Sequence, residues 1–142
     1  MKRILVALDA SKRAPEVLAA AARLGELAGA TLVVFRAIGV PPEMPPELFK
    51  VTDLTLEDVL RNNAHTDIAR LVADIPPERI EKIDTELATP WDGICTAARR
   101  HDVDLIVIGS HGYGGLDRLL GTTAGKVVNH SDRNVLVVRT PL

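Results

Sequence analysis

The chain has 142 residues, of which 46% are hydrophobic and 3% aromatic, and its formal net charge is −2. This length fits a single domain over residues 1–142 with a core of its own. Because aromatic residues are scarce, we expect a core of aliphatic side chains and alanine. The charge balance argues against nucleic acid as the main partner, since domains that bind nucleic acid carry a basic surplus.

Cysteine usage and hydropathy indicate the cellular compartment of the protein. The single cysteine, Cys95, cannot form an internal disulfide, which fits a reducing cytoplasm, and we interpret it as a small buried hydrophobic residue. No stretch approaches the roughly 18 apolar residues of a membrane span. The apolar run near the N-terminus ends at Asp9, too early for a signal peptide. We therefore expect a cytoplasmic protein without a membrane span.

Strand and helix patterns alternate from the N-terminus. Residues 3–8 form a continuous apolar run, which predicts a buried strand. A helix is expected over residues 11–27, with Ser11 as its cap and Gly29 as its stop. Residues 31–38 are a second run of β-forming residues, so a strand is expected on each side of this helix.

The middle of the chain contains a proline-rich segment and a second helix. Residues 41–46 cannot form regular structure and are either a surface connector or a mobile flap over a ligand. A helix is expected over residues 54–73. Residues 79–87 alternate imperfectly and carry several charges, which is typical of an edge strand.

The last third of the chain continues the alternation. Thr89 is the expected cap of a helix that ends near His101. Residues 104–108 form a short apolar strand, and a glycine-rich loop follows it. A further helix is expected to end near His130, and residues 134–139 form the closing strand.

This order of elements predicts a Rossmann-like α/β fold, with a single five-stranded parallel sheet of order 3-2-1-4-5 and helices on both faces. The most apolar strands, the first and the fourth, belong near the centre, and the polar third strand belongs at an edge. The winding reverses between strands 1 and 4, which opens a crevice at their carboxyl ends. The topology therefore brings Asp9, after the first strand, close to Gly109, after the fourth.

The glycine-rich loop over residues 109–123 joins a strand end to a helix start. Glycines let the main chain approach a ligand, and free N–H groups at a helix start attract anions, so we expect a phosphate there. Two other phosphate motifs do not fit. Residues 121–126 have three residues between their glycines where a Walker loop has four. Gly112 and Gly114 lack the third glycine of a dinucleotide fingerprint.

Several features together resemble the universal stress protein family. They are Asp9 after the first strand, the Gly-Ser-His-Gly turn at residues 109–112, the Gly-Thr pair at 121–122, and the closing strand 134–139. The resemblance covers nearly the whole chain, and residues 106–139 carry most of its specificity. The ATP-binding branch of the family shows the spacing G-x2-G-x9-G-[S/T], whereas this chain has G-x2-G-x8-G-T, which is one residue shorter.

The resemblance implies an adenine-nucleotide site in the crevice. Asp9 would lie at the ribose or at a metal ion, Mg²⁺ or Mn²⁺, that the phosphates bind. His111 fits either a turn-fixing role or a ligand contact, and Thr122 fits either a helix cap or a phosphate contact. The other implied nucleotide-binding residues are Ala7, Leu8 and Ala37 on the adenine side, Gly109, Gly112, Gly121 and Thr123 at the ribose and phosphates, and Ile108 beside them.

Three functions stay open. The first is a nucleotide-binding regulator of the stress response, which binds ATP, ADP or AMP and acts through an unidentified regulatory protein. The second is a nucleotide-free dimeric interaction protein of the same family, and the third is a slow ATPase. The sequence offers no residue in the position of a general base, so we assign no catalytic residue. The slow ATPase is therefore the least favoured of the three functions. The apolar edge strand Asn134–Arg139 predicts a homodimer through strand pairing.

Overall fold

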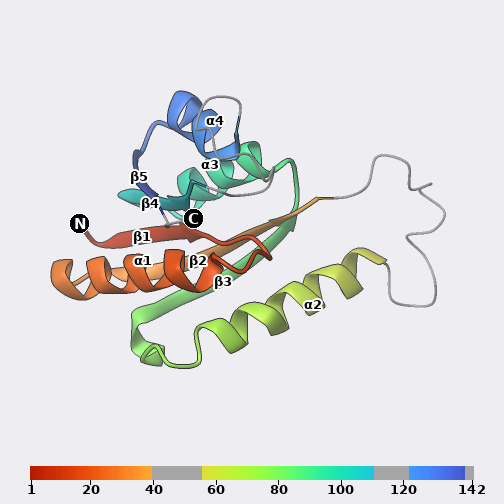
Figure 1. The fold of residues 1–142 in the computed structure, drawn as a ribbon, viewed down its shortest axis with the longest axis horizontal. Coiled ribbons are helices and arrows are strands. Elements are labelled where there is room, and N and C mark those ends of the chain that lie inside the picture. The colour runs from red at the N-terminus through yellow and green to blue at the C-terminus, as the bar shows by residue number, and fades with distance from the viewer. Residues whose placement is uncertain (40–55, 111–121, 140–142) are drawn as a thin grey trace.

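The computed structural model describes residues 1–39, 56–110 and 122–139, which form a five-stranded sheet with helices on both faces (Figure 1). The strands are β1 (Arg3–Ala7), β2 (Thr31–Ile38), β3 (Ile80–Leu87), β4 (Leu105–Gly109) and β5 (Asn134–Val138). The helices are α1 (Ala14–Ala28), α2 (Leu56–Leu71), α3 (Pro90–Arg100) and α4 (Thr123–His130), with the short 3-10 helix η2 (Pro77–Arg79) before β3. The strand bounds agree with those expected to within one residue. The proline-rich segment 41–46 lies outside the described residues.

The strand order is β3-β2-β1-β4-β5 and all pairings are parallel, which confirms the predicted sheet. Ala7 of β1 lies opposite Phe35 of β2 and Ile108 of β4. As expected, the apolar β1 is central, while the more polar β3 and the short β5 lie at the edges. None of the helices in the described ranges is long and apolar enough to cross a membrane.

Two apolar cores lie on the two faces of the sheet, because successive side chains of a strand point to opposite sides. Leu5 of β1 lies in the core beneath α3 and α4, whereas Ile4 and Val6 lie in the core beneath α1 and α2. Figure 1 shows the same two layers of helices. Cys95 is a free, buried thiol in the α3 core, which confirms its interpretation as a hydrophobic residue.

The start of the first helix differs from the prediction. α1 begins at Ala14 rather than near Ser11, and its N-cap residue Arg13 makes no capping side-chain bond within the described structure. The main-chain N–H of Ser11 donates to Asp9 Oδ1 at 2.9 Å, and its Oγ accepts from the N–H of Arg13 at 3.2 Å. An aspartate that bonds the main chain two residues on forms an Asx turn, which delays the helix. Gly29 ends α1 as predicted, with φ of +68°.

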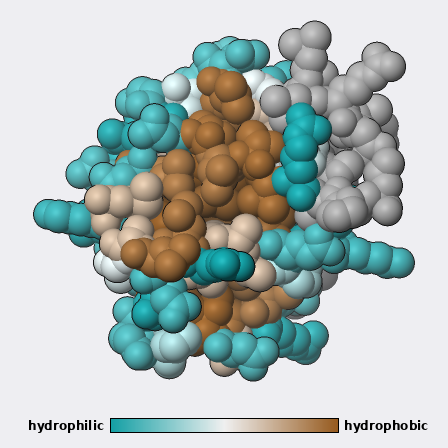
Figure 2. Space-filling view, turned by 60° about the vertical axis from the view of Figure 1, so that its left-hand side comes forward, coloured by the Kyte–Doolittle hydropathy of each residue, from teal (hydrophilic) through white to brown (hydrophobic). Residues whose placement is uncertain are grey.

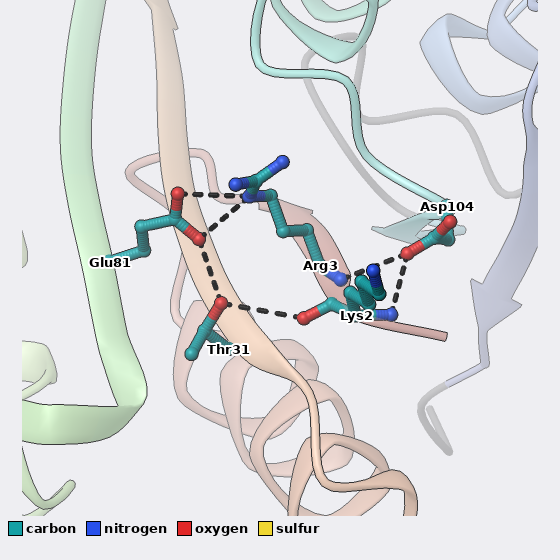
Figure 3. Close-up of polar contacts among 5 residues, drawn as sticks. All are labelled: Lys2, Arg3, Thr31, Glu81 and Asp104. Atoms are coloured by element: carbon teal, nitrogen blue, oxygen red, sulfur yellow. Dashed lines mark hydrogen bonds and ion pairs between the residues drawn. The ribbon is translucent and has the colours of Figure 1, made fainter.

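Polar contacts join the amino ends of four strands (Figure 3). Arg3 Nε donates to the two carboxylate oxygens of Glu81 at 2.9 and 3.0 Å, and Thr31 Oγ1 donates to Glu81 at 2.8 Å. Asp104 Oδ2 accepts the main-chain N–H groups of Lys2 and Arg3 at 2.6 and 2.9 Å. The hydrogen bond from Thr31 lowers the pKa of Glu81; burial partly opposes this effect and Arg3 reinforces it.

Replacing Thr31 with valine removes the hydroxyl and keeps the β-branched shape, so the pKa of Glu81 should rise toward its ordinary value. An NMR pH titration that follows the side-chain carboxyl carbon of Glu81 measures this pKa. Thr66→Val on α2 is the control and should leave it unchanged, because Thr66 bonds only locally to the Asn62 carbonyl in the described helix. An unchanged Glu81 pKa in Thr31→Val would contradict the assigned cause.

The same pair of proteins gives a stability test. Since the folded-state pKa of Glu81 is lowered, its stabilising contribution is present above the unfolded-state pKa. That contribution is lost as the pH falls through the folded-state pKa. The stability difference between the wild type and Thr31→Val should therefore shrink on acidification.

The close approach of α1 to β4 depends on the missing side chain at Gly109. A Cβ atom built on Gly109 would lie 2.8 Å from Cγ2 of Val17 on α1, closer than real Cβ contacts. Val17 is only 5% exposed, and its β-branched side chain has little rotational freedom. A larger residue at position 109 would therefore push α1 away from the sheet.

The variant Gly109→Ala should lose about 1–3 kcal/mol of unfolding free energy, the usual cost of overpacking. Val17→Ala removes the methyl groups that the new Cβ would meet, so the double variant should cost less than the sum of the two single variants. Urea unfolding of the wild type, the two single variants and the double variant measures the coupling free energy between positions 109 and 17. Strictly additive costs would show that Gly109 does not set the helix position.

Candidate functional site

The carboxyl ends of β1, β2 and β4 bring several of the expected nucleotide-binding residues into one region. Asp9 follows β1, Ala37 lies near the end of β2, and Gly109 ends β4. The pairing of β1 with β4 places Ala7 beside Ile108. The chain winds in opposite directions on the two sides of β1, and ligands of open α/β sheets bind at such a switch point.

The apolar residues of this region form its buried floor. Ala7, Ala37 and Ile108 lie in the core beneath α3 and α4, whereas Leu8 lies in the core on the opposite face. The side chains of all four are almost fully buried. Asp9 and Gly109, by contrast, are partly exposed. A ligand in the crevice would therefore meet the main chain of the strand ends rather than these apolar side chains.

The amino end of α4 lies on the same face of the sheet as Ala7, Ala37 and Ile108. Thr122 is the N-cap of α4, with its side chain 3% exposed and its Oγ1 accepting the main-chain N–H of Gly125 at 3.2 Å. Of the two roles open to Thr122 from the sequence, the structure thus shows the helix cap. Thr123 is partly exposed. Ala124 packs in the same core as Ala7, so the helix start lies on the α3 side of the sheet.

Three of the expected phosphate-binding residues are His111, Gly112 and Gly121, and all lie outside the described residues. Their roles, together with the effect of the shortened spacing, stay predictions.

Arg36 is a functional candidate that the sequence analysis missed. It lies in β2 between Phe35 and Ala37 and is only 7% exposed. Its Nη2 donates to the main-chain carbonyl of Asp9 at 3.0 Å, and its Nη1 lies 3.5 Å from Oδ2 of Asp67 on α2. Arg36 therefore holds the chain where it leaves β1. The sequence signal that could have identified Arg36 is a charged residue within a mostly apolar strand.

Asp9 is fixed at both its main chain and its side chain. Arg36 binds its carbonyl, and the N–H of Ser11 binds its Oδ1. A carboxylate held in this way can accept hydroxyl donors or contribute to cation binding. Within residues 1–39, 56–110 and 122–139, no group of three or more His, Cys, Asp or Glu residues could hold a metal. A bound phosphate would supply further oxygen ligands to a cation at Asp9.

A second group of charged residues joins β3 to the end of α3. Asp84 Oδ2 lies 2.7 Å from His101 Nε2 and 2.6 Å from Arg100 Nη2, and Arg100 also pairs with Glu86 at 2.8 Å. Burial alone would raise the pKa of Asp84, but the hydrogen bonds from His101 and Arg100 outweigh it and lower the pKa. His101 is the C-cap of α3, where the sequence predicted the end of this helix, and we interpret the group as structural.

Comparisons with known proteins agree with this arrangement. The model of the universal stress protein family matches residues 1–139. Universal stress protein A homolog 1 of Coxiella burnetii is 31% identical over 140 residues, which cover 96% of this chain and 95% of that protein. The solved structure of the universal stress protein UspA from Lactobacillus plantarum is similar with a TM-score of 0.76 and 25% identity, covering 97% of each chain.

A further solved structure, the universal stress protein from Archaeoglobus fulgidus in complex with dAMP, has a TM-score of 0.67 and 24% identity. The match covers 96% of this chain and 97% of that chain. The sheet order, the match over residues 1–139 and the close relative lead to one conclusion: the chain belongs to the universal stress protein family.

Proposed function

We propose that this protein is a stress-response regulator that binds an adenine nucleotide in the crevice at the carboxyl ends of β1, β2 and β4. The observation that carries the proposal is the placement of Asp9, which Arg36 and Ser11 fix at the switch point after β1. The Archaeoglobus fulgidus relative in complex with dAMP supports an adenine nucleotide as the ligand.

The described residues suggest how ATP, ADP or AMP would be held. Small side chains at Ala7 and Ala37 let a flat adenine ring approach the main chain of the strand ends. The amino end of α4 presents its positive dipole end and the partly exposed Thr123 to phosphates. Asp9 would accept the ribose hydroxyls or help to hold Mg²⁺ or Mn²⁺ at the phosphates.

The bound nucleotide would act as a signal rather than as a substrate. In this proposal, its presence changes the surface that the protein offers to a regulatory partner. The free, buried thiol of Cys95 needs no oxidising compartment, which is compatible with the cytoplasmic location that we propose.

The first test of this proposal measures nucleotide affinity. Asp9→Asn preserves a side chain that can form the turn with Ser11 but removes its charge, so it should weaken binding by about tenfold, the usual scale for a lost charged hydrogen bond. Titration calorimetry with ATP, ADP and AMP in the presence of Mg²⁺ measures this. The matched control Asp132→Asn removes an exposed charge beyond the far end of α4 and should change little.

Two results would count against the proposal. A wild-type protein that binds none of the three nucleotides would defeat the function and favour the nucleotide-free interaction protein. Equal affinities for the wild type and Asp9→Asn would defeat the placement of the site.

We also propose that two copies pair through β5. In the described part of the chain β5 pairs with β4 alone and forms an edge of the sheet. Leu136 of β5 is 41% exposed and Val128 of α4 is 45% exposed. Figure 2 brings this side of the molecule forward and shows a continuous hydrophobic area with hydrophilic residues around it. Two such edges can pair antiparallel about a two-fold axis.

The variant Leu136→Lys should convert the dimer to a monomer, because it places a charge in the apolar contact. Val59→Lys on α2 is the matched control, since Val59 is also 41% exposed. Sedimentation velocity at micromolar concentration measures the mass of each protein. A monomeric wild type, or a Leu136→Lys variant that stays dimeric, would refute pairing through β5.

A further inference from the structure

A pocket on the α1 and α2 side of the sheet shares Asp9 with the proposed nucleotide crevice and extends from there toward α2. Its volume is about 270 Å³. The turn after β1, the start of α1 and the last turns of α2 form its walls, and Arg36 lies at its base. Arg36 and Ala37 are adjacent in β2 and point to opposite faces, so this pocket and the adenine side of the crevice are separated by the sheet.

The guanidinium of Arg36 is buried with few of its hydrogen bonds made. It has five N–H donors, of which one on Nη2 bonds the Asp9 carbonyl. Nη1 reaches Asp67 only at 3.5 Å, and Nε has no hydrogen-bond partner among the described residues. The Asp67 side chain is 58% exposed, so solvent weakens its attraction for Arg36. A buried cation in this state is costly and would gain from an anion.

The rim of the pocket adds positive charge. Lys12 and Arg70 are exposed on its two sides, while Asp9 and Asp67 are its acidic residues. The described lining residues thus carry three positive and two negative charges. The Asp9 carboxylate already accepts the N–H of Ser11. Both carboxylates repel an incoming anion, and Asp67 is the one that also pairs with Arg36.

The helix start does not supply the donors. In the first turn of α1, the N–H of Ala14 bonds the Ser11 carbonyl, the N–H groups of Glu16 and Val17 bond the Arg13 carbonyl, and Pro15 has no N–H. An anion in this pocket would therefore be held by side chains.

We propose that this pocket binds a small phosphate-type oxyanion, with Arg36 at the base and Lys12 and Arg70 at the rim. The planar guanidinium matches the geometry of a phosphate and can donate two parallel hydrogen bonds to it. The ligand displaces the long contact between Arg36 and Asp67 and leaves the bond from Arg36 to Asp9 in place.

The experiment uses inorganic phosphate as the probe and the full chain without nucleotide. In ¹H–¹⁵N spectra, the amide signals of Ser11, Lys12 and Arg70 should shift and saturate as phosphate is added. Ser11 lies next to Asp9 and reports on both sites, so the shift of Arg70 on α2 is the one that identifies this pocket. The amides at the amino end of α4 report on the nucleotide crevice, and no nucleotide is needed for the result. Shifts confined to α4, or shifts near Ser11 that rise without saturation, would overturn the proposal.

Charge variants on the exposed rim leave the buried Arg36 intact and sharpen the test. Lys12→Gln and Arg70→Gln should each weaken phosphate binding by about two- to fivefold, the scale of an exposed ion pair. Asp67→Asn removes the competing carboxylate and should strengthen binding by a similar factor. Glu26→Gln makes the same charge change on the exposed face of α1 and should have no effect. Binding that is unchanged or weaker in Asp67→Asn would contradict the proposed role of Arg36.

Discussion

The parallel pairing of β1 with both β2 and β4 is the constraint on which the rest of the structure depends. Ile4, Leu5 and Val6 are fully buried, so β1 needs a strand at each edge and helices on each face. These conditions place β1 at the centre of the sheet. The chain leaves β1 toward α1 on one face of the sheet, whereas the helix after β4, α4, lies on the other face. Asp9 and Gly109 consequently stay partly exposed where the surrounding strand ends are buried.

The turn after β1 connects both proposed sites. Arg36 binds the main chain of Asp9 from the α2 side of the sheet, and Ser11 binds its carboxylate. The crevice lies on one side of this turn, and the pocket above Arg36 lies on the other. One buried guanidinium thus has two roles: it fixes the residue that we place at the nucleotide, and it leaves donors available to a second anion.

The fold could be predicted from the sequence because its determinants are local. Apolar runs mark the buried strands, and Gly29 marks a helix end that needs a left-handed residue. The start of α1 was misplaced because the Asx turn of Asp9 competes with a serine cap, and both use the same residue types. The polar pattern of β3 indicated an edge strand, but it did not reveal that Glu81 and Asp84 have partners on other elements.

The site was predictable only in part. Asp9 and Gly109 could be brought together from the sheet order, since each lies at the end of a strand, and the family resemblance added Ala37. The contact of Arg36 with Asp67 could not be predicted from the sequence, because it depends on how α2 packs against β2. The packing role of Gly109 against Val17 was also hidden, since a glycine at a strand end fits a ligand contact equally well.

The most direct test of the account is a map of the main-chain amides that respond to ATP in the ¹⁵N-labelled protein. A nucleotide at the switch point should give saturating shifts at Asp9, Ala37 and Gly109 and at the start of α4, with little change along β3. Shifts that are absent at millimolar ATP, or that gather on elements away from the carboxyl ends of β1 and β4, would contradict a nucleotide site at the switch point.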